Sequence, residues 1–245
     1  MLDDLAGLGP FFAVGSHPAG AQPVAPWRPA GELTAPTEAL RDRVTAVRAA
    51  LAARGGLAVR DIEPRVAASA VHLGLAARLV APALGAAVLS CPLDLRPPGL
   101  WWQDTAGGPV PLSVQAPDSE RESRPPGDGT GLVTAQWDRL LLEETIAPFT
   151  AAVALLVPVS GRVLWGNVAS AANAAAAQVA RARPDLAGEA WRAAGRLLAS
   201  PRLRAEPGPP GPGFRRASCC LFYRLAPGNP SAVCGDCVLL ARAGR

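Results

Sequence analysis

Lysine is absent from this 245-residue chain, so its basic charge rests on 24 arginines. Aromatic residues make up only 5% of the sequence. That scarcity argues against a nucleic-acid surface, because single strands are bound by basic residues interleaved with stacking aromatics. Cysteine is missing from the first 218 residues except for Cys91. The other four cysteines lie in the last 27 residues, and the chemistry of the protein is expected there.

Several catalytic and targeting patterns are missing as well. The sequence has no Ser/His/Asp constellation, and its paired carboxylates are the ordinary helical neighbours Glu143 and Glu144. The run GPPGPG at residues 208–213 has prolines where a phosphate-binding loop needs free N–H groups, so we expect no flavin or nicotinamide site. The N-terminus opens with acidic Asp3 and Asp4 and lacks the pattern of a secretory signal. We expect a cytoplasmic protein, either free or peripheral to the inner face of the membrane.

Apolar residues account for 49% of the chain and are mostly alanine, leucine and valine, which favours closely packed helices. The longest apolar stretch, residues 66–90, contains His72, Arg78 and Pro82. A central arginine costs about 2.5–3.5 kcal/mol in a membrane-spanning helix. We therefore predict a buried helix with His72 as a core histidine, and no transmembrane span.

The order of patterns predicts a mainly α fold: a helical body with a short β-hairpin insertion and a C-terminal cysteine-rich segment. We divide the chain into an irregular segment at residues 1–35, a helical body at 36–204, and a Pro- and Gly-rich linker with the cysteine segment at 205–245. Apolar periodicity and stop signals predict these elements of the body: helices at 36–55, 63–89, 137–157 (broken or kinked at Pro148), 163–183 and 186–198, a hairpin near 100–115, and a flexible loop at 115–131.

The charge of the chain is concentrated at its C-terminal end. From Pro201 onward, seven arginines stand against Glu206 and Asp236, a net charge of +5. Because the whole chain carries +4, the remaining residues sum to −1. A basic segment around clustered thiols favours an anionic partner, such as an acidic redox protein or an anionic ligand.

The spacing of the cysteines leaves three interpretations open. Cys234 and Cys237 form a Cys-x-x-Cys knuckle, which suits tetrahedral zinc. Cys219 and Cys220 are adjacent, so their side chains diverge and form such a knuckle poorly, whereas a [2Fe–2S] cluster offers ligand positions on two irons. A disulfide would need a strained vicinal bond or a cross-pairing, and a reducing compartment disfavours both.

Two runs in this region resemble the C-terminal signature of the FhuF-like ferric-siderophore reductases: RRASCCLFYR at residues 215–224 and CGDCVL at 234–239. The segment VLWGNVAS at 163–170 is similar to a helical part of that family. The gap between the cysteine pairs, residues 221–233, is thirteen residues and longer than is usual in the family. Its excess is turn-prone, and small loop extensions cost little, so cluster binding is still expected.

The resemblance implies a [2Fe–2S] cluster held by Cys219, Cys220, Cys234 and Cys237. It also implies a ferric-siderophore reductase of iron transport, which reduces siderophore-bound Fe(III) by one electron and releases Fe(II). The expected partners are a ferric siderophore and an external electron donor, which is a ferredoxin, a flavin reductase or a small reductant. The alternative is a non-catalytic zinc- or cluster-binding protein, either a redox sensor or a siderophore-handling accessory.

Three arginines near the cysteines are candidates for docking an anionic partner: Arg215, Arg216 and Arg224. Positive charge beside a cluster also favours its reduced form and raises its potential. The competing interpretation of each arginine is a solvated basic surface.

Overall fold

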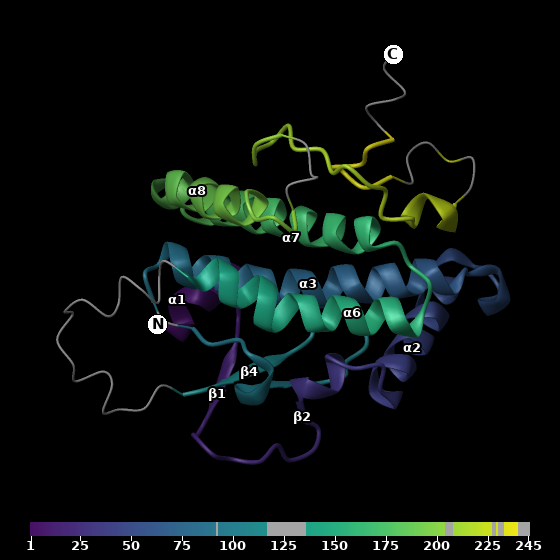
Figure 1. The fold of residues 1–245 in the computed structure, drawn as a ribbon, viewed down its shortest axis with the longest axis horizontal. Helices are drawn as coiled ribbons and strands as arrows, with labels where there is room; N and C mark the ends of the chain where they lie inside the picture. Colours follow the sequence, from purple (N-terminus) through teal and green to yellow (C-terminus); the bar gives the residue numbers. More distant parts are fainter. Residues whose placement is uncertain (92, 117–135, 204–207, 227–228, 230–232, 240–245) are drawn as a thin grey trace.

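The computed structural model describes residues 1–245 except 92, 117–135, 204–207, 227–228, 230–232 and 240–245. The described elements, in chain order, are α1 (Leu2–Gly7), β1 (Gly15–His17), β2 (Arg28–Pro29), η1 (Ala30–Leu33), α2 (Glu38–Gly55), η2 (Val59–Asp61), α3 (Pro64–Val88), η3 (Pro97–Gly99), β3 (Leu100–Trp102), β4 (Leu112–Gln115), η4 (Leu141–Ile146), α6 (Ala147–Leu156), α7 (Gly161–Ala182), η5 (Pro184–Leu186), α8 (Ala187–Leu198) and η6 (Phe222–Leu225). Figure 1 shows α7 and α8 as an outer layer, α3 and α6 beneath them, and the strands on the side of α3 away from α7. The expected mainly α fold with a small β portion is confirmed.

Helix α3 forms the centre of the core, as its apolar sequence predicts. Eighteen of its 25 residues are buried, and it packs against α2, α7 and α8. A helix that is apolar all round needs partners on every side, and these helices supply them. Among the described helices, α3 alone is long and apolar enough to cross a membrane, but 72% of its most apolar window is buried inside the protein. It is packed here as a core helix.

The ends of α2 follow from capping chemistry. Thr37 is the N-cap, and its hydroxyl oxygen accepts a hydrogen bond from the backbone N–H of Leu40 at 3.3 Å. Gly56 ends the helix in a left-handed conformation, with φ 62°, which glycine adopts without steric penalty. The start and stop predicted for this helix are confirmed.

Pro148 changes the type of helix instead of ending it. Residues 136–140 are helical, Leu141–Ile146 form a π-helix, and Ala147–Leu156 continue as α6. Because Pro148 has no N–H, it cannot bond the carbonyl four residues earlier, and the wider turn lies directly before it. The interruption predicted at Pro148 is therefore a local widening of a continuous helical segment.

The predicted hairpin is confirmed, and it forms the centre of a larger sheet. β3 and β4 pair antiparallel with Leu100 opposite Val114. β1 joins β4 in parallel and β2 joins β3 antiparallel, so the strand order is β1-β4-β3-β2. The expectation that residues 1–35 are irregular is wrong, since they contribute α1, β1, β2 and η1. Strands of two or three residues show too little alternation to be recognised in sequence; they form because β3 and β4 offer edges to pair with.

Arg78 of α3 forms hydrogen bonds that connect α3 to the N-terminal segment, residues 1–35. Its side chain is 2% exposed, and its guanidinium donates hydrogen bonds to the carbonyl oxygens of Phe11, Ala13 and Val110. Desolvation lowers the pKa of Arg78 to about 10, so it stays charged at neutral pH. A single arginine thus satisfies three backbone acceptors of the loops around the sheet.

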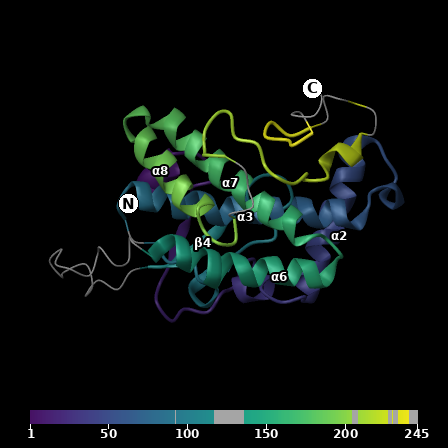
Figure 2. The same ribbon diagram turned by 45° about the horizontal axis from the view of Figure 1, so that its top comes forward.

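The C-terminal segment lies on the outer face of α7 and extends toward the beginning of α3 (Figures 1 and 2). The backbone N–H of Gly211 donates to Asn173 Oδ1 of α7 at 2.8 Å, and Phe214 is 3% exposed. At the far end, η6 contacts α3. The cysteines, separated from the body in sequence, are therefore packed against it. Residues 117–131 of the predicted flexible loop lie outside the described residues.

Candidate metal centre

The cysteine segment rests on two buried polar side chains of the helices beneath it. Ser69 of α3 donates its hydroxyl to the carbonyl oxygen of Cys220 at 2.9 Å. Asn167 of α7 donates its Nδ2 to the carbonyl oxygen of Ser69 at 3.1 Å and to its Oγ at 3.2 Å. Both Ser69 and Asn167 are fully buried. These bonds fix the backbone of the first cysteine pair above the contact between α3 and α7.

Arg216 joins both parts of the cysteine segment to α7. Its backbone N–H donates to the carbonyl oxygen of Asp236, inside the Cys-x-x-Cys turn, at 3.1 Å. Its Nε donates to the carbonyl oxygen of Ser218 at 2.6 Å. Its Nη2 donates to Asn167 Oδ1 at 2.7 Å and to the carbonyl oxygen of Val163 at 3.1 Å. Its Nη1 is buried and has no hydrogen-bond partner among the described residues.

The four cysteines of the segment occupy two environments. Cys220 and Cys237 are each 1% exposed, whereas Cys219 and Cys234 are half-buried, and all four are free thiols. The Sγ atoms of Cys220 and Cys234 lie 3.4 Å apart. Burial raises the pKa of Cys219, and the charges of Cys220 and Cys237 raise it further. The adjacent pair and the knuckle therefore approach each other across the thirteen-residue gap.

Backbone N–H groups donate to two of the sulfur atoms. The N–H of Leu221 donates to Cys219 Sγ at 3.3 Å, and that of Leu239 donates to Cys237 Sγ at 3.4 Å. Leu221 has φ 73°, a left-handed conformation that is unfavourable for leucine, and it turns the chain directly after the cysteine pair. Hydrogen bonds to sulfur stabilise thiolates and help to set the potential of iron–sulfur clusters.

The thiols of Cys220 and Cys234 are hydrogen-bonded to each other. This bond lowers the pKa of Cys220 and raises that of Cys234. The positive charge of Arg216 also lowers the pKa of Cys220. The thiolate is the form that binds a metal, so a lowered pKa at Cys220 favours ligation.

The donor set of the segment is four free thiols, which is the set that holds a [2Fe–2S] cluster by four-thiolate ligation. The two cysteine pairs meet at Cys220 and Cys234, whose Sγ atoms lie 3.4 Å apart. In the part of the chain that the structure describes, no group of three or more His, Cys, Asp or Glu side chains is placed to hold a single metal ion.

The family model described as the FhuF 2Fe-2S C-terminal domain matches residues 216–239. Residues 216–239 are therefore similar to the FhuF-type [2Fe–2S] domain, and this segment is called the FhuF-type domain below. Its cofactor is a [2Fe–2S] cluster, and the resemblance to FhuF-like ferric-siderophore reductases is confirmed for this segment. The match begins at Arg216 and does not extend to the helical body. Searches among curated proteins and among solved structures found no match to the chain.

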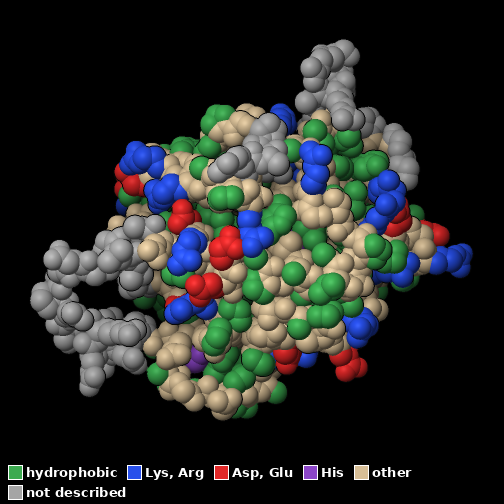
Figure 3. Space-filling model, in the orientation of Figure 1, with side chains coloured by type: hydrophobic (Ala, Val, Ile, Leu, Met, Phe, Trp, Pro, Cys, Tyr) green, Lys and Arg blue, Asp and Glu red, His purple; other side chains and the backbone are tan. Residues whose placement is uncertain are grey.

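The three arginines predicted to dock a partner differ in their surroundings. Arg216 is 1% exposed, so the docking role predicted for it is wrong; the sequence suggested a surface position because arginine is rarely buried. Arg224 pairs with Glu63 at 2.6 Å and lies over the ring of Tyr223, which ties the FhuF-type domain to the start of α3. Arg215 is half-buried. On the face shown in Figure 3, basic and acidic side chains are interspersed.

Sequence reasoning missed Ser69 and the supporting role of Asn167. Each is a polar residue with alanines close by in a buried helical stretch, and that isolation was the available signal. His72, one turn beyond Ser69 in α3, is fully buried, as predicted for a core histidine. Cys91 follows the opposite end of α3 and takes no part in the FhuF-type domain.

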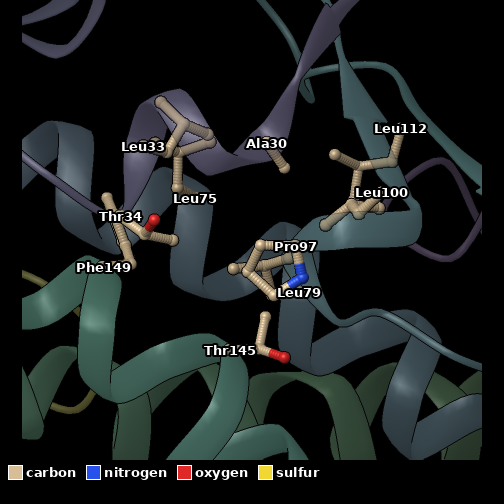
Figure 4. Close-up of a pocket in the computed structure, with 10 residues that line it drawn as sticks. All are labelled: Ala30, Leu33, Thr34, Leu75, Leu79, Pro97, Leu100, Leu112, Thr145 and Phe149. Carbon is tan, nitrogen blue, oxygen red and sulfur yellow. The ribbon is translucent and has the colours of Figure 1, made fainter. Parts of the chain in front are cut away.

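Two hollows lie outside the cysteine cluster. Figure 4 shows a cavity between the sheet, α3 and α6; it measures about 20 Å³, the volume of a single water, and its walls are largely apolar. A second hollow is lined by residues 208–211, Gly213, Phe214 and Arg215, directly before the FhuF-type domain. The first is a gap in packing, and the second is open surface of the linker.

Proposed function

We propose that this protein is an oxidoreductase that passes one electron to Fe(III) held by a siderophore, so that the iron is released as Fe(II). The observation that carries the proposal is the match to the FhuF 2Fe-2S C-terminal domain at residues 216–239. In this segment Cys220 and Cys234 are in contact, and the backbone of Cys220 is hydrogen-bonded to the helical body. The proposed cluster ligands are Cys219, Cys220, Cys234 and Cys237.

The cofactor, when bound, supplies one electron at a time. Fe(III) takes up that electron and becomes Fe(II), and an external donor (a ferredoxin, a flavin reductase or a small reductant) replaces it. Siderophores present hard oxygen donors that hold Fe(III) far more tightly than Fe(II), so the reduced metal leaves the complex. No side-chain acid or base takes part in this exchange.

The chain contributes ligands, exclusion of water and positive charge. The half-buried Cys219 and Cys234 mark the side on which a ferric chelate can approach, while Cys220 and Cys237 lie on the covered side. Arg215 is the docking candidate with the least internal pairing, and it attracts anionic chelates electrostatically. We place the reaction in the cytoplasm, where clustered thiols stay reduced.

Anaerobic purification tests the cofactor, and mixing with chelates tests the reaction. We expect a coloured protein with iron and sulfide bound and an EPR signal on reduction. When the reduced protein is mixed with ferric hydroxamate, catecholate or carboxylate siderophores, its absorption should return to the oxidised form. Fe(II) should then appear in a ferrous-specific indicator. A reducible cluster that passes no electron to any of these chelates would overturn the reductase proposal and leave a non-catalytic cluster protein.

A pair of matched substitutions tests the ligands. We expect Cys234→Ser to lose most of the bound iron and all chelate reduction, because a thiolate ligand is removed. Cys91→Ser, which lies at the far end of α3, should keep both. Full iron content and wild-type EPR in Cys234→Ser would remove this cysteine from the ligand set.

A further inference from the structure

Arg216 is a buried cation that pairs with no carboxylate among the described residues. Its side chain is 1% exposed, yet its guanidinium contacts only neutral acceptors, which are two backbone carbonyls and the amide oxygen of Asn167. Within the described residues it forms no ion pair, and Asp236 contacts it through a carbonyl oxygen only. An unpaired charge in a protein interior is costly, so a structure that retains one normally supplies a counter-charge.

Nη1 of Arg216 is a hydrogen-bond donor that could meet such a counter-charge. Nε and Nη2 are fixed by Ser218 and Asn167, so the guanidinium cannot rotate to satisfy Nη1 elsewhere. Nη1 is buried and without a partner among the described residues. Arg216 is also bonded to both parts of the cysteine segment, at Ser218 beside the first pair and at Asp236 inside the knuckle. Arg216 is therefore hydrogen-bonded next to both pairs of proposed ligands.

We propose that Arg216 is the internal counter-cation of the [2Fe–2S] cluster and a positioning residue that raises its reduction potential, with Nη1 as a donor available to sulfur. A cluster held by four thiolates is an anion, and reduction adds one more negative charge. A fixed buried cation stabilises that added charge more than an exposed one, because solvent screens it less. The inference rests on the proposed cysteine ligands, but it does not depend on the identity of the electron acceptor.

The test is the potential of the loaded protein, measured by redox titration followed by EPR and visible absorption, with iron and sulfide content determined for each variant. We expect Arg216→Gln to reduce the equilibrium constant for reduction at least about tenfold, which for one electron is a shift of ~59 mV to lower potential. Arg162→Gln removes the same charge from an exposed position of α7 and should change the constant less than about twofold. Arg216→Lys, which keeps the charge, should stay closer to wild type than Arg216→Gln.

A second variant covers the case in which Arg216→Gln does not hold a cluster. Asn167→Asp places a carboxylate 2.7 Å from Nη2 and neutralises Arg216 without removing it. We expect it to lower the potential in the same direction. A wild-type potential in a fully loaded Arg216→Gln protein overturns the proposal, and so does a wild-type potential in Asn167→Asp when the first variant is empty. If both variants are empty and Arg216→Lys is empty too, Arg216 serves folding alone and the proposal is wrong.

These outcomes separate this inference from the proposed function. A wild-type protein whose cluster titrates normally but reduces no ferric chelate overturns the reductase and leaves the role of Arg216 intact. A protein that reduces ferric chelates and keeps its potential in Arg216→Gln overturns the role of Arg216 alone.

Discussion

At the scale of single residues, the polar side chains buried under the FhuF-type domain form hydrogen bonds to its backbone and to Arg216, and not to its thiols. Ser69 bonds the carbonyl oxygen of Cys220, and Asn167 bonds Ser69 and Arg216. Both helices thus act on the proposed ligands indirectly, by fixing the turn from which they project. Outer groups of this kind orient metal ligands and tune the metal in many proteins.

Removing the Ser69 hydroxyl tests this support. We expect Ser69→Ala to lower the free energy of unfolding by about 1–3 kcal/mol, because the buried carbonyl of Cys220 loses its donor. The cluster should also be lost faster to a chelator, as measured by the decay of its visible absorption. Ser160→Ala is the matched control, since Ser160 is exposed and makes no side-chain capping bond to α7. Equal decay in both variants would show that Ser69 does not support the cluster.

His72 makes stability depend on pH. Its Nε2 lies 3.0 Å from Thr150 Oγ1, which itself donates to the carbonyl oxygen of Ile146, so Nε2 carries the proton and Nδ1 is bare. Desolvation, with the nearby charge of Arg216, lowers the pKa of His72 to about 3. Above pH 6.5 His72 is neutral in both the folded and the unfolded protein. Below it the unfolded chain takes up the proton first, and stability is lost down to about pH 3.

We expect the free energy of unfolding to fall by about 2 kcal/mol from pH 6.5 to pH 5 through this residue alone. Urea unfolding of wild type and His72→Gln at each pH measures the effect, because acid sensitivity from all other groups is common to both. Parallel pH profiles for the two proteins would rule out His72 as the cause.

The residue scale is also where sequence reasoning succeeded and failed most clearly. The [2Fe–2S] cofactor was predicted from the grouping of four cysteines and from the family resemblance, because thiols are rare and their grouping is visible in the chain. The assignment of these cysteines as ligands stays a prediction. The contacts of Ser69 and Arg216 with the cysteine segment were not predicted. A serine in an apolar helix and an arginine in a basic tail are both common without any functional role. Ser69 acts through a contact 151 positions away, and Arg216 acts through contacts 49 and 53 positions away. No local pattern encodes such contacts.

At the scale of elements, α1 packs closely against α3 because position 85 of α3 is a glycine. A Cβ at Gly85 of α3 would come within 2.8 Å of the Phe12 ring and 2.9 Å of a Leu5 methyl group. Overpacking of this kind costs about 1–3 kcal/mol. We expect Gly85→Ala to destabilise the protein by that amount in urea or thermal unfolding.

Gly74 of the same helix offers the opposite control. It is exposed, and a Cβ there would meet nothing within 4 Å. Gly74→Ala should therefore stabilise the protein by roughly 0.5–1 kcal/mol through helix propensity. If both substitutions shift stability in the same direction, the close approach of α1 is not what Gly85 serves.

Element boundaries were predictable where local chemistry sets them. Thr37 and Gly56 fix the ends of α2 by capping and by a left-handed turn, and both act within a few residues. β1 and β2 were missed because strands of three and two residues exist only through their pairing with β4 and β3. The π-helix before Pro148 was seen only as an interruption, because its form depends on the helices packed around it.

At the scale of the whole molecule, the basic C-terminal end is partly neutralised by the body. Arg202 pairs with Glu143 and Arg224 with Glu63, so two of the arginines counted after Pro201 have carboxylate partners. For the proposed anionic chelate, we therefore expect a moderate attraction that reaches only about a Debye length.

We expect kcat/KM for an anionic ferric chelate to fall about threefold to tenfold when ionic strength rises from ~0.01 to ~0.15 M. A neutral ferric chelate of similar size, assayed in the same buffers, should change less than about twofold. Equal salt dependence for the two chelates would argue against electrostatic docking at this end of the molecule.

The hydrogen bonds from α3 and α7 to the FhuF-type domain also determine whether this domain can be separated from the helical body. A chain ended before Pro201 would leave the hydroxyl of Ser69 and the amide oxygen of Asn167 without their partners in the FhuF-type domain. It would also expose the surface that the buried Phe214 and Arg216 now cover. The domain expressed alone would lose the same contacts from the other side. Transplanting its cysteines into an unrelated scaffold should therefore require the two helices to be carried with them, and gene fusions at the linker should preserve the whole body.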